Sequence, residues 1–144
     1  MKIKLTRKQR LTPIRRSNDI APILTEYYKR LDKYEKYKEH FLVVSLKIDL
    51  TINWIDIVSI GSLIGTVVGV QETFRRAIIE GGTAKLILAH NHPSKNIKPS
   101  ETDIKLTHKL VKAGKLLDIP IIDHLIVTTN KSYCSMADDG LIKF

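Results

Sequence analysis

Cysteine is almost absent from this chain of 144 residues, in which Cys134 is the single example. One cysteine cannot form a disulfide within the chain, and it cannot supply the several thiolates of a cysteine-based zinc motif. Long hydrophobic runs are also missing, so we expect no membrane span. The N-terminal residues Met1 to Lys4 lead into no apolar stretch, so no secretory signal is expected either. These absences together favour a cytoplasmic protein.

Acidic residues are missing from the N-terminal segment, where Asp19 is the first. The chain has a formal net charge of +9, and seven basic residues precede Asp19: Lys2, Lys4, Arg7, Lys8, Arg10, Arg15 and Arg16. Such a segment can neutralise phosphates, so nucleic acid is a candidate partner. A solvated terminus is the alternative, because no nucleic-acid-binding motif accompanies the charge. We expect residues 1–16 to form an irregular basic arm and residues 17–144 to form a single domain.

The spacing of apolar residues predicts a mixed α/β fold. Helices are expected at residues 17–32, 72–80 and 101–117. Strands are expected at residues 41–48, 54–60, 121–127 and 133–137, and the first two of these should pair antiparallel. The branched apolar run 86–89 is typical of a strand that is buried on both faces. The expected architecture is an α+β mixed sheet flanked by helices.

Two histidines stand one residue apart directly after the apolar run 86–89. Side chains two residues apart on a strand point to the same side, so His90 and His92 can aim their imidazoles at one point. Neutral imidazole is a good zinc ligand, and a catalytic zinc typically has three protein ligands and one position for water. Buried histidines also serve as ordinary hydrogen-bonding groups, so the pair alone does not decide between these roles.

A third candidate ligand stands where the next helix is expected to begin. Pro99 and Ser100 precede a helical pattern, which predicts Ser100 at the N-cap and Asp103 in the first turn. A helix that starts beside the end of the strand can bring Asp103 over the two histidines. Ser100 and Asp103 also resemble a capping box, with aspartate in place of the usual glutamate or glutamine. The joint arrangement of histidines and helix start favours a metal site.

The spacing of these residues resembles the motif of JAMM, or MPN-type, metalloproteases. His90-x-His92-Pro93 is followed, after the intervening loop, by Ser100-x-x-Asp103. The fuller string from Ala89 to Ser94 is similar to the RadC branch in particular, as are residues 122–127 and 38–41. The resemblance covers about residues 38–136. It implies a JAMM/MPN-like fold with a cytidine-deaminase-like three-layer arrangement.

The resemblance further implies a hydrolase that cleaves peptide or isopeptide bonds with Zn²⁺ as its cofactor. In that family two histidines and an aspartate bind the metal, and the matching residues are His90, His92 and Asp103. A glutamate from an earlier strand activates the metal-bound water, and Glu39 stands in its place. The motif serine, here Ser100, assists at the tetrahedral intermediate. Without the resemblance, Glu39 is better read as a surface carboxylate in a charged stretch.

The chain departs from the family pattern at one position of the motif loop. Lys95 stands where the family usually has glycine, which predicts a stiffer or more basic loop. The pair Asp123-His124 has no nucleophile beside it, so we expect it to support the metal site or the fold. His108 lies outside the motif and is expected to face solvent.

A non-enzymatic module remains the main alternative to the hydrolase. Such a RadC-like module, linked to DNA repair or mobile elements, would bind nucleic acid through the basic arm and keep a structural zinc. A metal-dependent nuclease is less well supported, because the adjacent letters of His90, Asn91 and His92 do not reproduce the dispersed nuclease motif of that name. The sequence identifies neither the substrate nor the oligomeric state.

Overall fold

The computed structural model describes residues 2–61 and 68–144. A single sheet with strand order β2-β1-β3-β4-β5 forms its centre. The strands are β1 (Glu39–Leu46), β2 (Ile52–Gly61), β3 (Lys85–Asn91), β4 (Ile121–Val127) and β5 (Tyr133–Ser135). The helices of these residues are α1 (Arg7–Leu11), α2 (Ser17–Arg30), α3 (Val70–Glu80) and α4 (Glu101–Leu116), with a short 3-10 helix at Glu35–Tyr37. No helix in the described part of the chain is long and apolar enough to cross a membrane.

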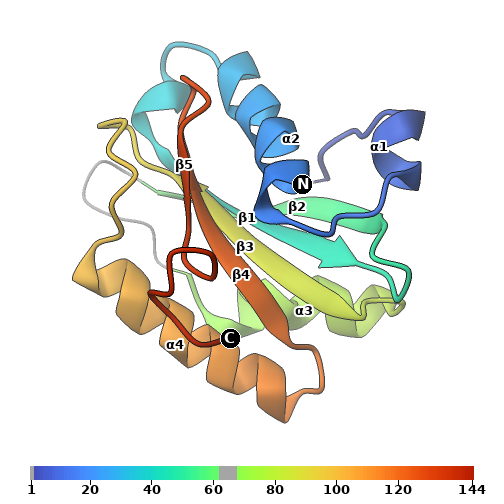
Figure 1. The fold of residues 1–144 in the computed structure, drawn as a ribbon. Helices are drawn as coiled ribbons and strands as arrows, with labels where there is room; N and C mark the ends of the chain where they lie inside the picture. Colours follow the sequence, from blue (N-terminus) through green and yellow to red (C-terminus); the bar gives the residue numbers. More distant parts are fainter. Residues whose placement is uncertain (1, 62–67) are drawn as a thin grey trace.

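Helices cover both faces of the sheet, with α2 on one face and α3 and α4 on the other (Figure 1). Alternation along β1 divides its side chains between two hydrophobic clusters. Leu42 and Val44 pack on the α2 side, whereas Phe41 and Val43 pack on the side of α3 and α4. The sheet is therefore buried on both faces, and the fold is the expected three-layer α/β arrangement.

The predicted elements are confirmed, with shifts of a few residues at their ends. β1 already begins at Glu39, and β3 continues through Asn91, so that His90 belongs to the strand. The antiparallel pairing of β1 with β2 is confirmed as well. β3 runs antiparallel to β1 and parallel to β4, which places His90 between Phe41 and Ile126. The candidate ligand thus lies on a strand that is paired on both sides.

The irregular structure expected for residues 1–16 is wrong in part, because the middle of this segment is helical. Residues Arg7–Leu11 form α1, and the N–H of Ile3 donates a hydrogen bond of 2.9 Å to a carbonyl of β2. Ile14 is only 4% exposed and belongs to the hydrophobic cluster beneath α2, against which Ile3 and Leu5 also pack. These apolar residues alternate with the charges, and their burial attaches the segment to the sheet. The domain boundary at residue 16 stays a prediction.

Replacing Ile14 tests whether this segment is part of the folding unit. Ile14→Ala removes a buried aliphatic side chain and leaves a cavity, so we expect the free energy of unfolding to fall by about 2–5 kcal/mol. Leu11→Ala is the control, because Leu11 is 65% exposed; its effect should stay within about 0.5 kcal/mol. Urea denaturation followed by circular dichroism measures both variants. If Ile14→Ala lowered the free energy of unfolding as little as Leu11→Ala does, the packing of this segment against the sheet would be contradicted.

Candidate metal centre

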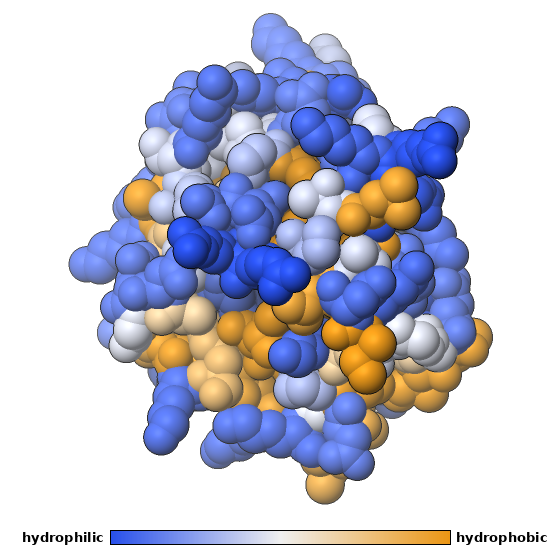
Figure 2. All heavy atoms as spheres, turned by 45° about the vertical axis from the view of Figure 1, so that its right-hand side comes forward, coloured by the Kyte–Doolittle hydropathy of each residue, from blue (hydrophilic) through white to orange (hydrophobic). Residues whose placement is uncertain are grey.

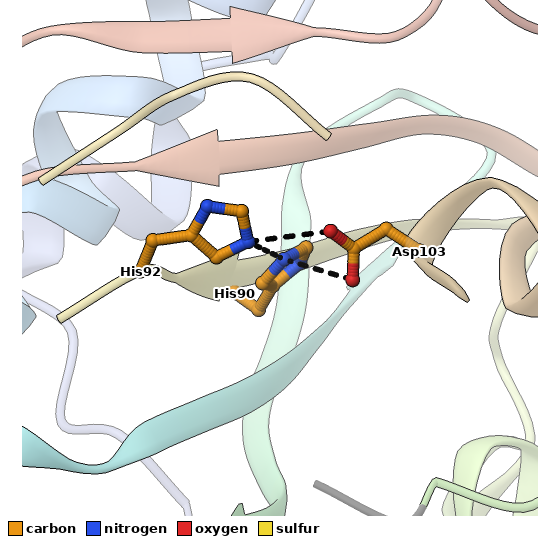
Figure 3. Close-up of side chains that lie close together, drawn as sticks. All are labelled: His90, His92 and Asp103. Atoms are coloured by element: carbon orange, nitrogen blue, oxygen red, sulfur yellow. Dashed lines mark hydrogen bonds and ion pairs between the residues drawn. The ribbon is translucent and has the colours of Figure 1, made fainter. Parts of the chain in front are cut away.

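The two candidate histidine ligands stand at the end of β3. His90 is 3% exposed, and its ring faces the side of the sheet that α4 covers. His92 comes just after the strand, where the chain turns towards α4. The Nε2 atoms of the two rings are 2.9 Å apart (Figure 3). The strand phase read from the sequence therefore brings both imidazoles to one point.

Asp103 completes the cluster from the first turn of α4. Its Oδ2 atom lies 3.2 Å from Nε2 of His92, and its Oδ1 atom lies 3.5 Å from Nε2 of His90. The same carboxylate accepts the N–H of Ser100 at 2.8 Å, while Ser100 Oγ accepts the N–H of Asp103 at 3.0 Å. This reciprocal pair is the predicted capping box. The cap holds the carboxylate in the orientation in which it meets the histidines.

The outer hydrogen bond of His92 determines which of its nitrogens faces the cluster. Nδ1 lies 2.7 Å from the carbonyl oxygen of Asn96, which can only accept, so Nδ1 carries a hydrogen. In the neutral ring, Nε2 then presents a lone pair towards Nε2 of His90. Nitrogens at this separation, beside a carboxylate, need a proton or a metal ion between them.

The donor set of the cluster fits a zinc ion. One ligand atom from each of His90, His92 and Asp103 lies within 4.8 Å of the other two. Two imidazoles and one carboxylate are typical ligands of a tetrahedral catalytic Zn²⁺, and they leave the fourth position for water. The three residues that the sequence selected as ligands are therefore close enough to hold one metal ion together.

Charge within the cluster changes the pKa values of its members. Burial disfavours the charged form of Asp103, but hydrogen bonds from His90 and His92 outweigh burial and lower the pKa of this carboxyl group. The hydrogen bond to Asp103 in turn raises the pKa of His92 above its usual 6.5. Without a metal, the negative carboxylate therefore favours a proton on His92. A metal ion that binds here must displace that proton.

Glu39 borders the same cluster as the first residue of β1. It is half-buried and lines a small cavity together with two members of the cluster and three apolar residues: His90, Asp103, Phe41, Val68 and Leu106. Its negative charge also contributes to the raised pKa of His92. The glutamate that the family resemblance selected is thus close to the candidate metal centre in space, although the hydrogen-bonded residues His40 and Asn91 beside them are 51 positions apart in sequence.

Asn91, the residue between the two histidines, holds the backbone on both sides of Glu39. Its side-chain oxygen accepts the N–H of His40 at 2.7 Å, and its side-chain nitrogen donates to the carbonyl of Lys38 at 3.0 Å. Asn91 is buried, so these bonds are shielded from water. The strand that carries the candidate ligands therefore also fixes the position of the candidate base.

Two residues outside the motif contact the cluster from behind. His124 on β4 is fully buried, and its Nε2 lies 2.8 Å from Nδ1 of His90. Its Nδ1 lies 2.6 Å from Oγ1 of Thr107 on α4. Burial holds the pKa of His124 well below its usual value. Sequence reasoning missed Thr107, although its position one helical turn after Asp103 places both residues on the same face of α4.

The adjacent residue Asp123 has a different role. Its carboxylate accepts hydrogen bonds from Ser135 Oγ at 2.7 Å and from the N–H of Ala137 at 3.1 Å, which fastens the chain after β4. The expected supporting role of the pair is therefore divided, since His124 contacts the candidate ligand His90 and Asp123 holds the chain around β5. His108 is exposed, as the sequence predicted.

The basic residues of the N-terminal segment lie outside this cluster. Lys2 forms an ion pair with Glu80 at 2.9 Å. The other candidates for nucleic-acid contact are exposed to solvent: Lys4, Arg7, Lys8, Arg10, Arg15 and Arg16.

Comparison with known proteins places the chain in a family. A family model described as the RadC-like JAB domain matches residues 14–141. The chain belongs to the RadC-like JAB domain family. It is 38% identical over 131 residues to a UPF0758 protein of Methanosarcina mazei, covering 91% of this chain and 56% of that protein. It is also 40% identical over 129 residues to a UPF0758 protein of Chloroflexus aurantiacus, covering 90% of this chain and 53% of the relative.

A UPF0758 protein of Methanosarcina acetivorans is 41% identical over 109 residues, or 76% of this chain and 47% of its own length. The chain thus spans about half the length of the curated relatives it matches. The names of these relatives state no enzymatic activity. Membership of the family supports the fold and the candidate metal site, and it does not by itself establish an activity.

The backbone conformation at Lys95, in the motif loop of this RadC-like domain, explains why glycine suits this position. Lys95 has φ of 62°, in the left-handed region that glycine adopts without steric cost. Its N–H donates a hydrogen bond of 2.9 Å to the carbonyl of His92, which closes the turn after the ligand. The side chain is exposed, so the substitution adds a positive charge to the loop.

The raised pKa of His92 predicts how metal binding depends on pH. A proton on His92 competes with the metal, and the stabilised proton is lost only as pH rises through the raised pKa. Zinc affinity should therefore increase with pH between about 6 and about 8, with its midpoint above the usual histidine pKa of about 6.5. Titration with Zn²⁺ against a competing chelator measures this dependence, and His108→Ala should leave it unchanged. A zinc affinity that stays constant over this pH range would contradict the assignment of His92 as a metal ligand.

Proposed function

We propose that this domain is a zinc-dependent hydrolase of the JAMM type that cleaves a peptide or isopeptide bond. The observation that carries the proposal is the convergence of His90 Nε2, His92 Nε2 and the Asp103 carboxylate beside Glu39. Membership of the RadC-like JAB domain family supports the same chemistry, because JAB domains are generally metalloprotease-like. The kind of bond follows from the resemblance to JAMM proteases.

The metal and the candidate base would have different roles in the first part of the reaction. A Zn²⁺ ion held by His90, His92 and Asp103 would lower the pKa of a bound water and polarise the substrate carbonyl. Glu39 lines the cavity beside two of these ligands, where its carboxylate can accept the proton of the water. The same carboxyl group can then donate that proton to the departing amine. The rest of this cavity is lined by the apolar residues Phe41, Val68 and Leu106. Electrostatic interactions are stronger there because apolar surroundings have a low dielectric constant.

Ser100 is suited to stabilise the negative oxygen of the tetrahedral intermediate. Its Oγ accepts the N–H of Asp103, so the hydroxyl hydrogen is left to donate. The N-cap position fixes the serine at the start of α4, one turn from the metal ligand. A preorganised donor at such a position typically contributes about 10²–10³ in rate.

Separate substitutions distinguish the candidate base from the candidate ligands. Glu39→Gln keeps the shape of the side chain but cannot accept the proton, so we expect hydrolysis to fall by about 10²–10⁴ with zinc retained. Asp103→Ala and His92→Ala should lose both zinc and hydrolysis. His108→Ala, a substitution at an exposed histidine outside the cluster, is the matched control.

The measurements are zinc content by elemental mass spectrometry and cleavage of libraries of peptides and lysine-linked isopeptides. We expect about one zinc ion per chain, as three ligands and one open position require. Wild-type protein without zinc, even after reconstitution with Zn²⁺, would contradict the proposal. Zinc loss in Glu39→Gln would instead show that this glutamate is a ligand.

The alternative is a DNA-associated module that binds nucleic acid through the basic segment. The observation that favours it is the exposure of Arg7, Lys8 and Arg10 on α1, whose first turn has no acidic residue. Figure 2 brings the α1 side of the molecule forward and shows mostly hydrophilic side chains over its upper half. Such a surface would contact phosphates without sequence preference. The zinc would then have a structural role.

Neutralising these side chains tests the module without disturbing the core. Deletion of residues 1–16 would remove the buried Ile14 as well, so Arg7→Gln, Lys8→Gln and Arg10→Gln in one variant is the better choice. We expect weaker binding to duplex DNA and a salt dependence whose slope falls by about 0.9 for each lost phosphate contact. Fluorescence anisotropy at several salt concentrations measures both the affinity for DNA and the slope of its salt dependence. An affinity for DNA that is independent of salt would contradict this alternative.

A further inference from the structure

Thr107, His124 and His90 form a continuous chain of hydrogen bonds behind the candidate metal centre. Oγ1 of Thr107 lies 2.7 Å from the carbonyl oxygen of Asp103 and 2.6 Å from Nδ1 of His124. Nε2 of His124 then lies 2.8 Å from Nδ1 of His90. Thr107 and His124 are both 0% exposed, so water does not compete for these bonds. The chain links the backbone of α4 to the ring of a candidate ligand.

The positions of the hydrogens along this chain follow from its first acceptor. The carbonyl of Asp103 can only accept, so the single hydroxyl hydrogen of Thr107 points to it. The lone pair of Oγ1 then faces His124, whose Nδ1 must carry the hydrogen of that bond. A neutral His124 has one ring hydrogen, so its Nε2 accepts. Nδ1 of His90 therefore donates.

This order leaves the lone pair of His90 on Nε2, the atom that lies 2.9 Å from Nε2 of His92. We propose that Thr107 and His124 are positioning residues that fix the metal-binding tautomer of His90. The inference rests on the proposed metal site, and it extends that site to two residues outside the motif. Both candidate histidine ligands then present the same nitrogen, since the carbonyl of Asn96 fixes His92 in the same way.

The partner of Nδ1 of His90 is itself a histidine, His124, and this choice has a physical consequence. Metal-bound histidines commonly donate their outer hydrogen to a carboxylate, a carbonyl or water. A carboxylate or carbonyl fixes the tautomer by itself, because it cannot donate. An imidazole can donate or accept, so His124 specifies the tautomer of His90 only while Thr107 determines its own. The threonine hydroxyl, two residues away from the metal along the chain of bonds, is therefore decisive.

Two substitutions at one position test this role. Thr107→Val has nearly the same shape but no hydroxyl, so the preference of His124 for a hydrogen on Nδ1 is lost. Thr107→Ser retains the hydroxyl and should restore the wild-type behaviour. The direct readout is two-bond ¹H–¹⁵N NMR of the histidine rings in metal-free protein, at a pH below the raised pKa of His92, where a proton lies between the two Nε2 atoms. We expect Nδ1–H tautomers of His90 and His124 in wild type and in Thr107→Ser, and a mixture or reversal in Thr107→Val.

Zinc affinity gives a second readout. We expect Thr107→Val to bind Zn²⁺ about 10–100 times more weakly than wild type, with Thr107→Ser close to wild type. Thermal unfolding shows whether each variant is folded. If Thr107→Val does not fold, the wild-type spectrum still decides, because an Nε2–H tautomer of His90 or His124 overturns the inference.

The outcomes separate this inference from the proposed function. An unchanged His90 tautomer in folded Thr107→Val overturns the positioning role, whatever the zinc affinity. Wild-type protein with the expected tautomers but no zinc binding contradicts the proposed hydrolase and supports the hydrogen-bond order inferred here. Expected tautomers, weaker zinc binding in Thr107→Val and rescue by Thr107→Ser support both.

Discussion

The pairing of β3 between β1 and β4 is the constraint on which the candidate metal centre depends. Its register sets His90 between Phe41 and Ile126, and the neighbouring strands bring Glu39 and His124 close to His90. A slip of one residue would turn His90 to the opposite face, since side chains alternate along a strand. The sheet is buried on both faces, so hydrophobic packing opposes such a slip. The forces that stabilise the fold thus also determine the geometry of the cluster.

Helix capping and the proposed metal ligation compete as interpretations of the sequence, but the geometry of Asp103 is compatible with both. The carboxylate of Asp103 accepts the N–H of Ser100 and faces the histidines at the same time. Its oxygens have lone pairs for both kinds of contact. A negative charge at a helix N-terminus is also favourable in itself. The candidate metal centre therefore uses an interaction that the helix requires in any case.

Local patterns predicted much of this molecule, and long-range contacts account for what they missed. The phase of His90 and His92 and the start of α4 at Ser100 depend on neighbouring residues, so the sequence predicted them. Thr107 and His124 meet only through the packing of α4 and the parallel pairing of β3 with β4, which no local pattern specifies. Glu39 stood out through the family resemblance alone, because its stretch is charged. The N-terminal segment was misread because its basic residues concealed the apolar ones between them.

The two hydrogen bonds of Asn91 join the strand of the candidate base to the strand that carries the candidate ligand His90. Its amide holds the carbonyl of Lys38 and the N–H of His40, directly before and after Glu39. The entropy lost in arranging these groups is therefore lost during folding, before any substrate binds. A substrate would meet a preassembled set of groups, and its binding energy would be left for its own alignment.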